Sequence, residues 1–147
     1  MNKRDHENRL INFAVSIVEI VESMSNAKAA NHLAGQLLRS GTSPALNYRE
    51  AQSGESRKDF IHKIKIVLKE LRESNICLSI INRTGLCKNE YKIINALNES
   101  NELIAIFVKS VETAQKNSEQ LIEKKQLAQP LLFPKPHHKS KIVDPCS

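Results

Sequence analysis

Apolar residues recur at helical spacing near the start of this chain. Between about residues 5 and 24 they follow one another mostly at intervals of three and four, which is the period of one helix face. The members of this stripe are Leu10, Phe13, Ala14, Ile17, Val21 and Met24. A second strip beside it contains Ile11, Val15 and Val18. The pattern predicts a helix with more apolar surface than one core-facing stripe provides.

Three further stretches show the same period, at about residues 27–53, 56–83 and 89–125. Four helices with short connections predict an all-α protein, an antiparallel up-and-down four-helix bundle over residues 1–126. The apolar faces of the first, third and fourth helices exceed what one bundle interior needs, so we expect a homo-oligomer. Residues 127–147 contain several prolines and no periodic pattern, which predicts a flexible basic tail.

The second helical stretch is interrupted by Gly41 and Pro44. Proline lacks an N–H and clashes with the carbonyl four residues before it in a straight helix. Two interpretations are open: one long helix kinked here, or two helices of which the second has Ser43 as its cap and Pro44 as its first residue. Both predict a bend or break between Gly41 and Pro44.

Four polar or aromatic residues follow the proline directly. Because Asn47, Tyr48, Arg49 and Glu50 are consecutive, they point to all sides of a helix turn, and at least one faces the bundle or a neighbouring subunit. A buried polar group needs a partner, and Arg49 and Glu50 could pair across an interface. We interpret this segment as a structural motif rather than a ligand site; its residues are Gly41, Pro44, Asn47, Tyr48 and Glu50.

The charges are unevenly distributed. The chain of 147 residues has a net charge of +6. Residues 39–92 hold 11 Lys and Arg against 6 Asp and Glu (+5), residues 93–123 hold 2 against 5 (−3), and residues 124–147 hold 5 against 1 (+4). Basic stretches attract nucleic acid, or they pair with an acidic segment of the same or a neighbouring chain.

A row of cations in the third helical stretch is the candidate binding site. Its members, spaced by four, three, four and three residues on one helix face, are Lys58, His62, Lys65, Lys69 and Arg72. The same basic segment adds Arg39, Arg49 and Arg57. Such a row suits RNA or DNA phosphates, and the alternative is a solvated helix face. Aromatic residues do not interleave with these charges, which argues against base stacking.

Catalytic patterns are missing from the sequence. We find no glycine-rich phosphate loop, no nucleophile elbow and no paired histidines on a helix face, so we expect no enzyme and no cofactor. The spacing of Cys77, Cys87 and Cys146 matches no metal motif and predicts reduced thiols. The adjacent His137 and His138 are weak evidence for a metal, and we expect none. No apolar stretch has the length of a membrane span, so we expect a cytoplasmic protein.

Two central motifs carry a family resemblance. The stretch QLLRSGTSPALNYREAQ, followed by DFIHKIKIVLKEL, resembles the bacterial four-helix-bundle proteins found in intervening sequences of 23S rRNA genes. The matching segments are Gln36–Ser43, Asn47–Ala51, Asp59–Glu70 and Glu99–Leu103, within a resemblance over roughly residues 10–117. Pro44 departs from the family pattern, which usually has an aliphatic residue there.

The resemblance implies an assembly and partners. It implies an antiparallel bundle with a long second helix, assembled as a ring-like homopentamer. A similar protein, the accessory variability determinant of diversity-generating retroelements, is an accessory protein that partners a reverse transcriptase and has a basic surface for nucleic acid. For this chain the resemblance therefore implies binding to itself, to RNA or DNA, and to a reverse transcriptase.

Overall fold

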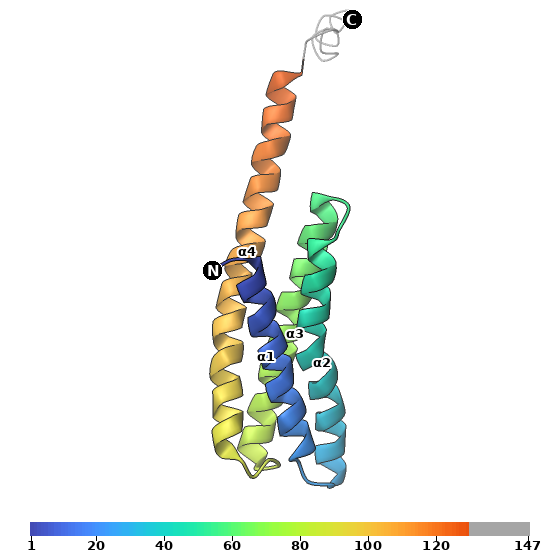
Figure 1. Ribbon diagram of the computed structural model, residues 1–147, viewed down its shortest axis with the longest axis vertical. Coiled ribbons are helices and arrows are strands. Elements are labelled where there is room, and N and C mark those ends of the chain that lie inside the picture. The colour runs from blue at the N-terminus through green and yellow to red at the C-terminus, as the bar shows by residue number, and fades with distance from the viewer. Residues whose placement is uncertain (130–147) are drawn as a thin grey trace, which may run out of the picture. The chain divides into compact units, whose positions relative to one another are not determined.

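The computed structural model describes residues 1–129, and these form four helices (Figure 1). The helices are α1 (Lys3–Glu22), α2 (Lys28–Gln52), α3 (Arg57–Thr84) and α4 (Glu90–Ala128). The all-α class and the four-helix bundle are confirmed, and the predicted ends lie within a few residues of those observed. The chain divides into two compact units, Met1–Gln115 and Lys116–Ser147, and the core and sites described below lie in the first. The predicted tail lies almost entirely outside the described residues.

The core of the first unit is aliphatic. All four helices contribute fully buried side chains at the predicted period, and the largest are Leu10, Phe13, Ile17, Ile20, Leu37, Ile64, Leu71, Leu78, Ile81, Ile93, Leu103 and Phe107. The second apolar strip of α1 is not part of this core. Ile11, Val15 and Val18 remain 41–50% exposed, so the excess apolar surface inferred from the sequence lies on the outside of the described chain.

Local signals set the ends of α3. The hydroxyl of Ser56 accepts the backbone N–H of Asp59 at 3.1 Å, which satisfies one of the orphan donors of the first turn. At the other end Gly85 has φ 68°, in the left-handed region that favours glycine, and its N–H donates to the carbonyl of Asn82. These two residues confine the third helix to the stretch that its apolar period predicts.

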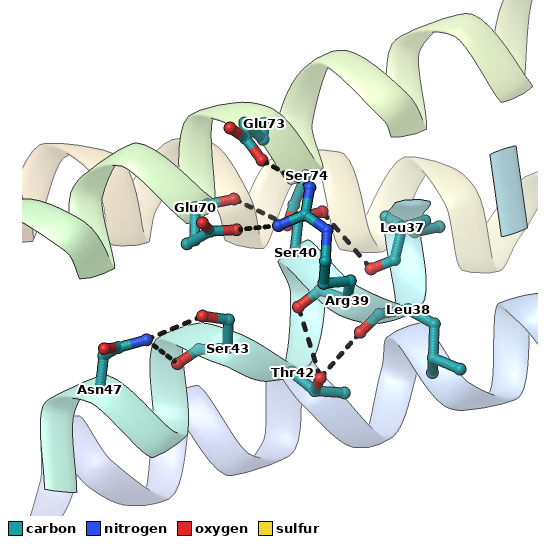
Figure 2. Close-up of polar contacts among 10 residues, drawn as sticks. All are labelled: Leu37, Leu38, Arg39, Ser40, Thr42, Ser43, Asn47, Glu70, Glu73 and Ser74. Carbon is teal, nitrogen blue, oxygen red and sulfur yellow. Dashed lines mark hydrogen bonds and ion pairs between the residues drawn. The ribbon is translucent and has the colours of Figure 1, made fainter. Parts of the chain in front are cut away.

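The second helix is continuous through its proline. α2 runs unbroken from Lys28 to Gln52 with a buried Pro44 inside it, so the interpretation of two helices with Ser43 as a cap is wrong. Side chains bond to backbone carbonyls around the proline: Thr42 Oγ1 donates to Leu38 O at 2.8 Å, and Asn47 Nδ2 donates to Ser43 O at 3.0 Å (Figure 2). The helix persists because its buried face is held by neighbours on both sides. A kink at Pro44 stays a prediction.

The residues after the proline have partners within the chain. Tyr48 is 4% exposed, and its ring lies edge-on to Phe107 of α4 and His6 of α1, with centroids 5.6 and 6.1 Å apart. Arg49 on the surface pairs with Glu7 of α1 at 2.8 Å, and Glu50 pairs with Lys63 of α3. This segment thus ties α2 to the other three helices of the first unit. The pairing of Arg49 and Glu50 across a subunit interface is not tested by these contacts.

Candidate nucleic-acid interface

The predicted cation row lies on the exposed face of α3. The five members Lys58, His62, Lys65, Lys69 and Arg72 are all exposed, and Arg57 at the start of the helix is exposed as well. Within residues 1–129, none of these six side chains makes an ion pair with a carboxylate. Their charge is therefore uncompensated at short range and available to an anion.

Two of the predicted site residues lie on α2 rather than on α3, and both form ion pairs with carboxylates. Arg39 of α2 bridges to α3, where its guanidinium donates to Glu70 Oε2 at 3.2 Å and to Glu73 Oε2 at 3.1 Å (Figure 2). Arg49 pairs with Glu7, as described above. Both arginines pair with carboxylates of the chain, unlike the cations of α3.

A groove runs along the cation row. It has a volume of about 750 Å³, which falls within the range of binding clefts. Lys65, Lys69 and Arg72 line it together with Arg39, and the remaining lining residues include the apolar Leu68, Ile76, Cys77 and Val111. The groove therefore combines three unpaired cations, the ion pair of Arg39 with Glu73 and aliphatic walls.

A polar network beneath the groove joins α2 to α3. Glu70 is 7% exposed, and its carboxylate depends on Arg39 for a counter-charge. Next to it, Ser74 Oγ lies 2.9 Å from Glu70 O and 3.0 Å from Ser40 Oγ, both serines being fully or almost fully buried (Figure 2). Buried groups of this kind are costly unless every partner is in place. The network therefore holds the two helices at one register and keeps the cation row in position.

The one thiol in the lining of the groove belongs to Cys77. Burial raises the pKa of the Cys77 thiol, which keeps it protonated and a poor nucleophile at neutral pH. Cys77 and Cys87 are both free thiols. Residues 1–129 contain no group of three or more His, Cys, Asp or Glu side chains placed to share a metal ion. His137, His138 and Cys146 lie outside the described residues.

Some contacts could not be found by sequence reasoning. The capture of Arg39 by Glu70 and Glu73 depends on the register between two helices, which no spacing within one helix reveals. The packing of His6 against Tyr48 is a second case, since the two residues are 42 positions apart and lie in different helices. Among the described residues, no helix combines the length and apolar character that crossing a bilayer requires.

The comparisons with known proteins agree with this architecture. The model of one family, described as 23S rRNA-intervening sequence protein, matches residues 5–109. The chain belongs to the 23S rRNA-intervening sequence protein family. A solved structure of a protein with unknown function from the S23 ribosomal protein family of Bacteroides thetaiotaomicron is 32% identical to this chain. The match covers 76% of this chain and 99% of that one, with a TM-score of 0.69.

The family match covers every charged residue of the site; of the groove lining, Val111 lies beyond it. Its range contains the whole of α2 and α3, including the motif around Pro44 and the cation row. Among curated proteins no match was found. The resemblance stated from the two central motifs is therefore confirmed at the level of the 23S rRNA-intervening sequence protein family.

Proposed function

We propose that this chain is a non-enzymatic, homo-oligomeric helical module that binds RNA or DNA phosphates through the exposed face of α3. The observation that carries the proposal is the contrast between paired and unpaired cations. Arg39 and Arg49 are neutralised by carboxylates of the fold, whereas the cation row of α3 is exposed and makes no ion pair within residues 1–129. Neutralising phosphates with such cations releases counterions and stabilises the complex.

Oligomerisation strengthens this binding. Each subunit contributes its own cation row, and several weak contacts held together act at a high effective concentration. Five subunits are the expected number from the family resemblance. The exposed aliphatic side chains of α1 supply apolar surface for subunit contact, since large exposed apolar patches usually mark interaction sites.

The test is the salt dependence of binding. Replacing Lys65, Lys69 and Arg72 by Gln removes three exposed charges and should leave the fold intact. The affinity for an RNA hairpin and for a DNA duplex should fall similarly. The slope of log K against log salt should flatten by about one unit per lost contact. An RNA hairpin taken from an intervening sequence of 23S rRNA is the first probe to use, because the family is described by that location.

A matched control tests whether the position of the removed charges matters, or only their number. Replacing the exposed Lys28, Lys88 and Lys109 by Gln removes the same three charges from positions outside the α3 face. This control should bind nearly as tightly as the parent. If the α3 variant binds as tightly as the parent, or if both variants weaken binding equally, the α3 face is not the binding site.

The second candidate function is a protein-binding scaffold without nucleic-acid binding. The observation in its favour is the amount of aliphatic surface left exposed, such as Leu46 at 65% and Ile76 at 61%. A scaffold should form the oligomer and show no salt-dependent binding of either probe. By family resemblance, a reverse transcriptase is the partner protein to test, in a pull-down with the purified oligomer.

A further inference from the structure

Arg39 binds its two carboxylate partners through different nitrogens. Its Nη1 donates to Glu70 Oε2 at 3.2 Å, and its Nη2 donates to Glu73 Oε2 at 3.1 Å (Figure 2). The side chain of Glu70 is 9% exposed, whereas that of Glu73 is 38% exposed. One nitrogen of the guanidinium is therefore bound in the interior, and another is bound at the surface.

The two ion pairs differ in what it costs to break them. A buried carboxylate that loses its counter-charge is strongly destabilising, whereas an ion pair at the surface contributes little to stability. Glu70 thus holds Arg39 firmly, and Glu73 is a partner that another anion can replace. Because Glu70 fixes one nitrogen, the guanidinium stays in place when Glu73 leaves the other.

The exchangeable pair lies in the groove of the cation row. Arg39 and Glu73 both line this groove, together with Lys65, Lys69 and Arg72. Lys69 and Glu73 are four residues apart on α3, so their side chains lie on one helix face. A phosphate held by the three unpaired cations therefore meets the Glu73 carboxylate, which repels it, and the guanidinium of Arg39, which attracts it.

We propose that a nucleic-acid phosphate displaces Glu73 from Arg39, so that Glu73 is a built-in competitor of the ligand and Arg39 is a fourth phosphate-binding residue of the groove. The inference rests on the proposed function and names a regulatory contact of the same site. Phosphate oxygens accept strong charge-assisted hydrogen bonds from a guanidinium, so the exchange replaces one anion on Arg39 by another. Binding then breaks one surface ion pair, which weakens it and confines it to ligands that can displace Glu73.

Glu73→Gln removes the competing charge and tests the exchange. Position 73 is at the surface, and Arg39 still neutralises Glu70, so the variant should keep the helical circular dichroism of the parent. Its affinity for the RNA hairpin and the DNA duplex of the first test should rise about two- to fivefold, which corresponds to the loss of one surface ion pair. The slope of log K against log salt should steepen by up to about one unit. The reason is that a released Glu73 takes up a salt cation in the parent, which offsets one cation set free from the phosphates.

Two further variants separate the exchange from the simple removal of a negative charge. In Arg39→Lys the single ammonium stays with Glu70 and has no second nitrogen to offer. Adding Glu73→Gln to this variant should therefore raise the affinity by less than about twofold. Glu50→Gln is the matched control, because it breaks a different ion pair between α2 and α3, that with Lys63, and Glu50 does not line the groove. This control should bind like the parent.

The exchange is overturned if Glu73→Gln leaves the affinity unchanged or lowers it, if Glu50→Gln raises it equally, or if the gain is the same in the Arg39→Lys background. The Gln variant of Lys65, Lys69 and Arg72 distinguishes two kinds of failure. If that variant binds as tightly as the parent, the α3 face is not the binding site and the inference falls with the proposed function. If that variant binds weakly while Glu73→Gln brings no gain, the inference alone is refuted.

Discussion

The contact between Gly41 and Ile17 offers the sharpest test of how α1 and α2 pack. A Cβ atom added at Gly41 would lie 2.6 and 2.7 Å from Ile17 Cγ1 and Cγ2, and 3.0 Å from Ile17 Cβ. Ile17 is fully buried and branched at Cβ, so its side chain has few rotamers and no free space to move into. The two helices can approach this closely only because residue 41 has no side chain.

The expected cost of Gly41→Ala follows from two opposing effects. Alanine favours the helix by about 1 kcal/mol over glycine. Overpacking a well-packed core costs about 1–3 kcal/mol. Contacts of 2.6 and 2.7 Å lie roughly 1 Å inside the optimal carbon–carbon separation, so the upper part of that range applies. We therefore expect Gly41→Ala to lower the free energy of unfolding by about 1–2 kcal/mol.

Gly35→Ala is the matched control on the same helix. Gly35 is exposed, and a Cβ added there would meet no atom within 4 Å. This variant should raise the free energy of unfolding by up to about 1 kcal/mol. Urea unfolding followed by circular dichroism measures both variants, at equal protein concentration because association shifts apparent stability.

A double variant identifies the cause. In the Gly41→Ala background, Ile17→Ala removes the two shortest contacts. The double variant should therefore lower the free energy of unfolding by about 1–2 kcal/mol less than the two single variants do in sum. If Gly41→Ala instead stabilises the protein as much as Gly35→Ala does, the close approach of α1 and α2 does not constrain residue 41 and the reasoning is refuted.

Two further predictions concern His6 and Pro44. The pKa of His6 is lower in the folded protein than the value of 6.5 expected in the unfolded chain, and burial is the main cause. The unfolded state therefore binds more protons below about pH 6.5, and the free energy of unfolding should fall as the pH drops from 7 to 5, less so in His6→Asn. Unfolding curves of both proteins across that range check this, and equal slopes would contradict it. Pro44→Ala should raise the free energy of unfolding by about 1 kcal/mol, since Ser40 O regains a helical donor. A lower urea midpoint for this variant would show that the proline ring contributes more packing than the hydrogen bond does.

The sequence by itself determined the helices of this protein. A period of three to four residues follows from the geometry of the α-helix, so the four elements could be located without any tertiary information. The buried face of α4 could not, because Ile94, expected in its apolar stripe, is 44% exposed while the neighbouring Ile93 is buried. The ends of α3 at Ser56 and Gly85 could also be predicted from the sequence, because a capping residue bonds to backbone that is close to it along the chain. The exposure of the cation row also follows from its position on α3 beside the apolar stripe rather than within it.

Only the tertiary structure decided what depends on the register between helices. From the sequence, Pro44 left open one kinked helix or two separate helices, and only the tertiary structure shows that α2 is continuous. Arg39 was grouped with the free cations, and only the approach of α3 brings Glu70 and Glu73 to it. The hydrogen bonds that Asn75 Nδ2 donates to Ser100 Oγ and Asn101 Oδ1 of α4 likewise require both helices in place. The physical reason is common to these cases: the period of one helix fixes which way a side chain points, and the neighbouring helix determines what it meets.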